Sequence, residues 1–224
     1  ANIAKYEDIL NNNDSMTAVI MEDLDQIKKE FGRKRRTVIE NAEEAVFEEN
    51  KIEEQEVVFL MDRFGYARTV DAATYERNKE AADSENKYVL HAMNTGKLCV
   101  FTAGGKMHQI KVLDLPHGKF RDKGLPIDNV SNYDSTAEEI VYICDAEQTR
   151  YAKLLFATKQ GMIKKVDGQE FQVAKRTIAA TKLQADDAVV SIQVITDNQQ
   201  VVLQTKDGYF LRFAADEFSE KKKG

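Results

Sequence analysis

The sequence of 224 residues contains no tryptophan and only two prolines, two cysteines and three histidines. Two cysteines, Cys99 and Cys144, cannot build a disulfide framework, so we expect a reducing, cytoplasmic setting. The isolated histidines lack the spacing of a metal site, so no metal-dependent active site is expected. No apolar run approaches the roughly 20 residues of a membrane-spanning helix, and the first residues do not resemble a signal peptide.

The net charge of −6 is distributed unevenly along the chain. Residues 1–56 contain 8 Lys or Arg against 15 Asp or Glu, whereas residues 57–224 contain 24 against 23. Within the second part, residues 150–182 contain eight basic and two acidic residues. A basic segment in an acidic protein predicts a surface for a polyanion. The alternative is a solvated face whose charges are balanced by acids from elsewhere in the fold.

Residues 1–45 are expected to be helical. Apolar residues at Ile3, Tyr6, Ile9 and Leu10 have helical spacing, and residues 11–14 interrupt it. Asp14 or Ser15 is expected to cap a second helix, whose apolar stripe runs from Met16 to Phe31. Gly32 is expected just past its end in a left-handed conformation, and the basic residues 33–36 then complement the helix C-terminus. Such helices cannot bury their stripes alone, so we interpret them as the end of a longer helical structure.

From residue 46 onward an internal repeat dominates, which we align on Gly65, Gly105, Gly161 and Gly208. Seven to five places before each glycine stand three apolar residues, at 58–60, 98–100, 154–156 and 201–203. Asp62 or a threonine stands three places before the glycine, an apolar residue five places after it, and Tyr, Leu or Phe ten places after it. Four copies that agree at these positions indicate repeated structural units.

Each repeat is predicted to be a β-hairpin whose glycine supplies the positive φ of the turn. Further β-like runs at 88–93, 140–144 and 189–195 precede the later hairpins. The copies are spaced by 40, 56 and 47 residues, which is the size of a propeller blade. We therefore predict a mainly β, propeller-like domain over residues 46–224. A sandwich or barrel is the alternative, but these folds rarely repeat at such a period.

Cations recur at equivalent places of the repeats. Arg63, Lys159 and Lys206 stand at the turns, and the outgoing strands contain Arg68, His108, Lys164, Lys165 and Arg212 three or four places after the glycine. A rim of repeated cations can hold a bent phosphate backbone without reading bases. The third repeat is the most basic, so we expect it to contribute most to binding. The alternative is that cations at strand edges protect against aggregation.

Several segments resemble the C-terminal domain of the A subunits of bacterial DNA gyrase and topoisomerase IV. The motifs are KQGMIKK at 159–165, TKDG at 205–208, KVLDLP at 111–116 and KGLPI at 123–127. Residues 27–32 and 35–37, with 6–10 upstream, resemble the stretch that joins the coiled coil of these enzymes to that domain. The resemblance runs essentially from end to end of the chain.

The resemblance implies a β-pinwheel, a propeller variant in which strands are exchanged between blades and a basic outer edge binds DNA. It also implies an enzyme that passes one duplex through another with a catalytic tyrosine, Mg²⁺ and ATP, as an A-subunit homodimer with an ATPase B subunit. None of that chemistry is expected in this chain, so no residue is predicted to be catalytic and no cofactor is expected. The chain ends soon after the fourth hairpin, which leaves open whether further blades follow.

One segment differs from the gyrase pattern and helps to decide between gyrase and topoisomerase IV. Gyrase A subunits contain a glycine-rich basic box after the first hairpin, whereas residues 75–85 here lack glycine and include Glu76, Glu80, Asp83 and Glu85. These carboxylates would repel phosphate, so we predict a topoisomerase IV-like domain that supports relaxation and decatenation. A divergent gyrase domain that wraps DNA is the alternative, and a protein-interaction scaffold is a second one.

The complete set of predicted DNA-contacting side chains combines the rim with cations of the intervening loops. It consists of Arg63, Arg68, Arg77, Lys79, Lys106, Lys119, Arg121, Lys123, Lys159, Lys164, Lys165, Lys175, Arg176, Lys206 and Arg212.

Overall fold

The computed structural model describes residues 2–37, 52–196 and 198–224. The chain divides into two compact units, Ala1–Asn50 and Lys51–Gly224. The expected boundary at residues 45 and 46 lies outside the described residues. None of the helices in the described ranges is both long enough and apolar enough to cross a membrane.

The first unit contains two helices, α1 (Asn2–Asn11) and α2 (Asn13–Phe31). Helix was expected here, but the cap differs: the side chain of Asn12, not of Asp14 or Ser15, accepts a hydrogen bond from the backbone of Asp14. Gly32 also differs from expectation, because its φ of −62° is not left-handed and its N–H bonds to the carbonyl of Lys28. No side chain of either helix is buried within its own unit.

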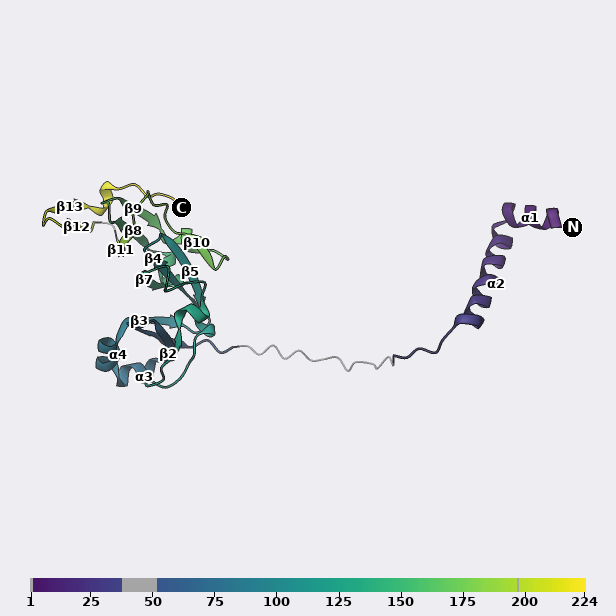
Figure 1. Cartoon of the computed structure of the whole chain (residues 1–224), viewed down its shortest axis with the longest axis horizontal. Coiled ribbons are helices and arrows are strands. Elements are labelled where there is room, and N and C mark those ends of the chain that lie inside the picture. Colours follow the sequence, from purple (N-terminus) through teal and green to yellow (C-terminus); the bar gives the residue numbers. More distant parts are fainter. Residues whose placement is uncertain (1, 38–51, 197) are drawn as a thin grey trace. The chain divides into compact units, whose positions relative to one another are not determined.

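The second unit is built from four antiparallel hairpins within its described residues (Figure 1). They are β1 (Glu56–Asp62) with β2 (Tyr66–Asp71), β4 (Lys97–Thr102) with β5 (Lys106–Lys111), β8 (Lys153–Thr158) with β9 (Ile163–Asp167), and β12 (Gln200–Gln204) with β13 (Phe210–Ala214). All four glycines used for the alignment have positive φ, between 75° and 86°. The repeat therefore corresponds to the hairpins that the sequence predicted.

The residue three places before each glycine closes the turn. Its carbonyl accepts the glycine N–H at 2.9–3.3 Å in all four hairpins. In three of the turns its side chain also accepts the N–H of the residue after the glycine: Asp62 from Tyr66, Thr158 from Met162 and Thr205 from Tyr209. A short oxygen-bearing side chain is needed for this bond, which explains why the repeat has Asp or Thr here.

Strands are exchanged between repeats. The runs β3 (Asn86–Met93), β7 (Ile140–Asp145) and β11 (Val189–Ile195) pair with the first strand of the preceding hairpin. On the other side, β6 (Leu125–Pro126) follows the second hairpin but pairs with β2, and β10 (Thr177–Ala179) follows the third but pairs with β5. This exchange is the arrangement of a β-pinwheel, and the mainly β, propeller-like fold is confirmed.

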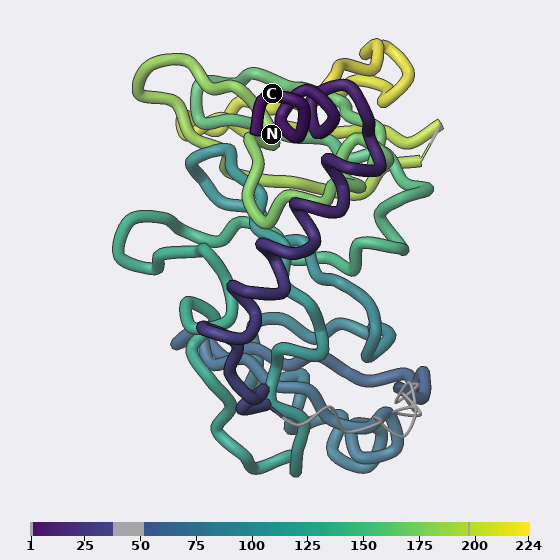
Figure 2. The backbone as a smooth tube through the Cα atoms, turned by 90° about the vertical axis from the view of Figure 1, so that its right-hand side faces the viewer, coloured from purple at the N-terminus to yellow at the C-terminus, as the bar shows by residue number. Residues whose placement is uncertain are grey.

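The sheets stack face to face, in the same order in which they follow one another along the chain (Figure 2). One core cluster joins the first and second sheets around Phe59, Val100 and Ile143, and another joins the second and third around Phe101 and Phe156. A smaller cluster joins the third and fourth sheets. Because the inner strands are covered on both faces, they need consecutive apolar residues rather than alternation. This packing accounts for the apolar triplets of the first three repeats, whereas Val202 in the fourth triplet is 56% exposed.

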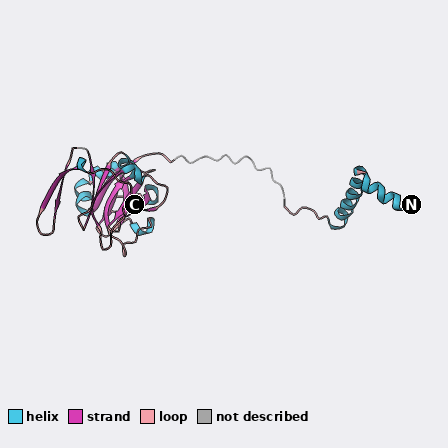
Figure 3. Ribbon diagram, turned by 90° about the horizontal axis from the view of Figure 1, so that it is seen from above, coloured by secondary structure: helices cyan, strands magenta, loops and turns pink. Residues whose placement is uncertain are grey.

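Short helices cover the remaining faces at the margins of the strands (Figure 3). Val58 and Leu60 of β1 pack with Tyr75 and Ala82 of α3 (Ala72–Arg77) and α4 (Lys79–Glu85). The other short helices are α5 (Ala146–Arg150), η1 (Val112–Asp114), η2 (Ile127–Val130), η3 (Gly168–Phe171) and η4 (Ala215–Glu217). The anchors expected ten places after the first three glycines are at most 5% exposed, and Phe218 in the fourth repeat contacts Phe213 at 4.8 Å between ring centroids.

Candidate nucleic-acid interface

The segments that cross between blades present cations at the outer edge of the sheets. Lys119, Arg121 and Lys123 precede β6 at the edge of the first sheet, and Lys175 and Arg176 precede β10 at the edge of the second. All five side chains are exposed. In the described part of the second unit, equivalent segments of successive repeats therefore place positive charge at equivalent edges.

A third segment extends this series beyond the predicted residues. The backbone of Glu220 forms an isolated parallel β-bridge with that of Lys165 on β9, and the N–H of Lys221 donates to the carbonyl of Lys165. Residues 220–221 therefore lie at the edge of the third sheet. Lys221 and Lys222 are exposed there. The prediction omitted them, although the spacing could have indicated them. A lysine stands fourteen places after every turn glycine, at Lys79, Lys119, Lys175 and Lys222.

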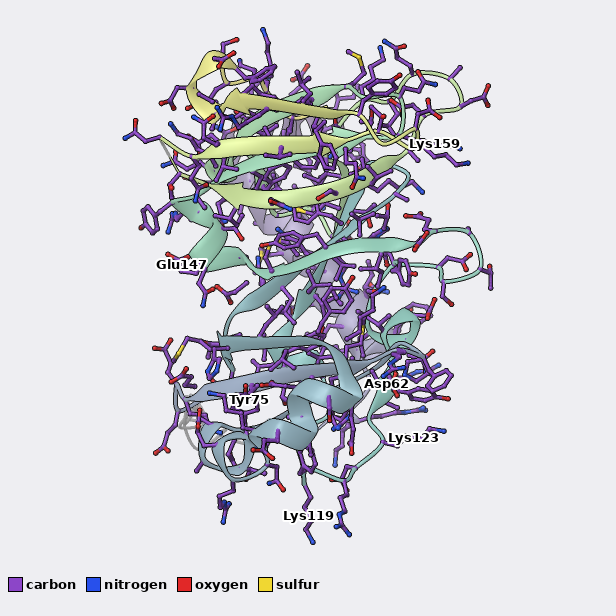
Figure 4. All side chains as sticks on the ribbon, turned by 90° about the vertical axis from the view of Figure 1, so that its left-hand side faces the viewer. Asp62, Tyr75, Lys119, Lys123, Glu147 and Lys159 are labelled. Carbon is purple, nitrogen blue, oxygen red and sulfur yellow. The ribbon has the colours of Figure 1, made fainter. Side chains whose placement is uncertain are left out.

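The turn cations form a second group. Arg63, Lys159 and Lys206 are exposed at the tips of the first, third and fourth hairpins. In Figure 4 the labelled Asp62, Lys123 and Lys159 lie toward one side of the stack of sheets, whereas Glu147 lies toward the opposite side.

Backbone hydrogen bonds tie the second and third turns to the same connecting segment. The N–H of Val189 bonds to the carbonyl of Ala103 in the second turn, and the N–H of Lys159 in the third turn bonds to the carbonyl of Ala188. The neighbouring residues 188 and 189 therefore lie between the two turns. These contacts give successive turns fixed positions relative to one another, as a rim that holds a curved ligand requires.

Lys106, at the second turn, differs from the other turn cations because it forms an ion pair with Glu138 at 2.5 Å. Glu138 also contacts Nε2 of the buried His108 at 3.2 Å. Burial by itself would raise the pKa of Glu138, but the hydrogen bonds from Lys106 and His108 outweigh it and lower that pKa below its ordinary value. Of the fifteen predicted cations, Lys106 is the one that forms an ion pair within the described parts of the chain.

The expectation that the outgoing strands present their cations to solvent is wrong for three residues. Arg68 is 8% exposed, Lys165 is 6% exposed and His108 is 1% exposed, because neighbouring sheets and exchanged segments cover β2, β5 and β9. The Nζ of Lys165 donates to the carbonyl of Ala215 at 3.0 Å, so it is a buried structural group. The third repeat thus has fewer accessible cations than its sequence suggested.

Other strand and helix cations lie apart from this pattern. Lys164 is half-buried, donates to the carbonyl of Gly224 at 3.4 Å and has a pKa lowered by burial. Arg212 is exposed, because the fourth sheet has two strands in the described residues. Arg77 and Lys79 are exposed on α3 and α4, where Arg77 bonds back to its own helix at the carbonyl of Ala73.

Within the described residues, no cluster of three or more His, Cys, Asp or Glu side chains could hold a metal ion. Cys99 and Cys144 are paired neighbours on β4 and β7, buried and free. The neighbouring Cys144 thiol and burial raise the pKa of the Cys99 thiol far above its ordinary value, which disfavours the reactive thiolate.

Comparison with known proteins agrees with the resemblance seen in the sequence. The family described as "DNA gyrase C-terminal domain, beta-propeller" matches residues 152–196 and 199–224. The DNA gyrase A protein of Lawsonia intracellularis is 28% identical over 234 residues, which cover 99% of this chain and 28% of the relative. The corresponding protein of Clostridium acetobutylicum is 28% identical over 224 residues, covering 94% and 27%. The chain thus spans little more than a quarter of these relatives.

Solved structures share the fold. The C-terminal domain of a DNA topoisomerase IV superposes with a TM-score of 0.67 at 23% identity, covering 76% of this chain and 55% of that one. The E. coli ParC C-terminal domain superposes with a TM-score of 0.63 at 16% identity, covering 76% and 69%.

Proposed function

We propose that this chain, which is similar to the C-terminal domains of type IIA topoisomerase A subunits, binds duplex DNA and bends it without reading its sequence. The observation on which this proposal chiefly rests is the recurrence of exposed cations on the exchanged segments, at Lys119, Lys175 and Lys222. Each neutralises one phosphate and releases condensed counterions. Contacts of this kind fix the path of the backbone but do not distinguish bases.

The spatial series of edges favours a curved duplex. Successive exchanged segments lie at the edges of successive sheets, so a backbone that follows them must follow the stack. Bending a short duplex costs on the order of 1–6 kcal/mol, which several phosphate contacts can offset.

Within this function we propose a topoisomerase IV-like role in relaxation and decatenation. Residues 75–85, where gyrase A subunits have their glycine-rich basic box, here form the end of α3, the single residue Asn78 and α4. Glu76 and Glu80 are exposed beside Arg77 and Lys79, and the carboxylate of Asp83 is bonded to the hydroxyl of Tyr75. This acidic surface opposes the further wrapping of DNA around the first blade.

The alternative is a divergent gyrase domain that wraps DNA for negative supercoiling. Nicked plasmid ligated in the presence of the chain distinguishes the two roles, because wrapped DNA retains supercoils after ligation. We expect no change in linking number per bound chain. A change that grows with protein concentration would support the gyrase-like role.

In the intact enzyme we propose that the chain contributes DNA binding alone. Strand passage would require the A-subunit homodimer, the ATPase B subunit, ATP and Mg²⁺, which act through other domains. The chain by itself is then expected to have no topoisomerase activity.

A protein-interaction scaffold remains the competing function, since propeller-like folds serve many unrelated roles. Fluorescence anisotropy with a 30-bp duplex of arbitrary sequence at 50 and 200 mM NaCl separates the two. We expect binding at the lower salt that weakens by about 10³-fold or more at the higher salt if six or more phosphates are contacted. Absence of binding at 50 mM NaCl would contradict DNA binding and favour the scaffold.

A further inference from the structure

A groove opens beside the first hairpin turn, and it has the features of a discrete anion site. It has a volume of about 740 Å³ and lies between the 62–64 turn, α4, β3 and the 120–123 part of the exchanged segment. Four cations line it, namely Arg63, Arg68, Arg121 and Lys123. Three of these are exposed, whereas Arg68 on β2 is 8% exposed.

Arg68 is the unusual member of this group. Its Nε is buried and has no hydrogen-bond partner. Its guanidinium lies 5.9 Å from the centroid of the Phe120 ring and forms no ion pair with any carboxylate of the described residues. A buried charge without a partner is costly, and a buried donor left unsatisfied adds to that cost. The site therefore favours a ligand that supplies a negatively charged oxygen.

The carboxylates around the groove are partly committed to the backbone. Asp62 accepts from the N–H groups of Phe64 and Tyr66 at 2.8 and 2.9 Å, and Asp122 accepts from the N–H of Lys119 at 2.7 Å. These bonds hold the two acidic side chains to their own turns. Glu85 also lines the groove and is exposed at its margin.

Asn86 contributes a second buried polar atom without a partner. The Oδ1 of Asn86 on β3 is buried without a partner, while its amide nitrogen donates to the carbonyl of Ala82. Asn86 also lines the groove. An acceptor needs a donor, which a water bound to an anion supplies.

We infer that this groove binds one DNA phosphate, which accepts a hydrogen bond from Nε of Arg68. The positive charges of Arg63, Arg121 and Lys123 attract the same phosphate. This inference rests on the proposed DNA binding and specifies where the duplex enters the first blade. The phosphate fixes the register of the backbone here, and the exposed lysines of the later segments then guide it along the stack.

The test measures the site and the function separately. Duplex binding is followed by anisotropy for the wild type, Arg68→Met, Arg68→Lys and the exposed control Lys111→Met. Arg68→Met keeps most of the apolar stem against Phe120, and its thermal unfolding checks that it folds. In parallel, the Nε–H resonance of Arg68, assigned by its loss in Arg68→Met, is followed by NMR while inorganic phosphate or the duplex is added to the wild type.

We expect Arg68→Met to weaken duplex binding at least about tenfold, the loss typical of a hydrogen bond to a charged group, and Lys111→Met to weaken it much less. Arg68→Lys should fall between them, because it restores charge without the Nε–H. The Arg68 resonance should shift saturably with both additions. If the wild type binds duplex but the Arg68 resonance does not shift, the proposed phosphate site is wrong while the proposed DNA binding stands. This outcome does not depend on the stability of the variants. Failure of the wild type to bind duplex would overturn the proposed function itself.

Discussion

At the scale of single residues, Glu138 ties the segment before β7 to β5 of the same sheet through its contacts with Lys106 and His108. Because its pKa is lower in the folded chain than the ordinary value of 4.5, the folded state binds fewer protons than the unfolded state near and below that pH. The stabilisation it provides is therefore present above pH 4.5 and is lost as the pH falls through the folded pKa.

We predict that Glu138→Gln lowers the free energy of unfolding by about 1–3 kcal/mol at pH 7 and by much less near pH 3. Urea unfolding of both proteins at the two pH values measures this. The control is Glu147→Gln, whose exposed ion pair with Arg150 should contribute less than about 1 kcal/mol. An equal loss at both pH values would mean that Glu138 does not act through its charge.

The charge of a residue was easier to predict than its environment. Arg68 and Arg212 both lie on outgoing strands, three and four places after their glycines, yet Arg68 is buried and Arg212 is exposed. The difference comes from β6 and the 119–124 segment, which cover β2, and no local pattern predicts a partner nearly 60 residues away. Lys222 was missed for another reason, because the repeat was aligned only as far as the tenth place after each glycine.

At the scale of elements, the turn glycines are equivalent in conformation but not in surroundings. A Cβ added to Gly105 would lie 2.7 Å from the carbonyl oxygen of Thr181, whereas one added to Gly161 meets nothing within 4 Å. Both positions have positive φ, so alanine at either one should lower the free energy of unfolding by about 1–2 kcal/mol.

Gly105→Ala is therefore predicted to destabilise the fold more than Gly161→Ala, by roughly 1–3 kcal/mol, because the backbone at Thr181 must also move. Thermal unfolding of the two variants under one set of conditions provides the comparison. Equal losses would show that the left-handed conformation alone matters and that the contact with Thr181 is readily relaxed.

The hairpins could be predicted from the sequence because each is a local unit with its own turn chemistry. The pairing of β3, β7 and β11 could not, since a run of apolar residues has no signal for whether it pairs with the hairpin before it or after it. The residues alone showed only that these runs precede the later hairpins, and only the family resemblance indicated exchange. The cap of α2, Asn12, likewise lies two residues before the nearer of the two predicted caps, Asp14.

At the scale of the whole second unit, the function depends on where charge accumulates rather than on net charge. The most basic stretch of sequence, residues 150–182, presents fewer exposed cations than expected, because Lys165 is buried. The exchanged segments contribute more to the proposed DNA-binding surface than the sequence suggested, because they place exposed lysines at successive sheet edges.

The most direct measurement of this claim is the salt dependence of duplex binding by Lys119→Gln/Lys175→Gln, compared with the matched control Lys97→Gln/Lys111→Gln. The control residues are also exposed, but they pair with each other at the ends of β4 and β5 that lie away from the turn. If each exchanged-segment lysine contacts one phosphate, the slope of log K against log salt should become shallower by about 2 in the first variant. The control should keep the wild-type slope. Equal slopes in the two variants would contradict the account.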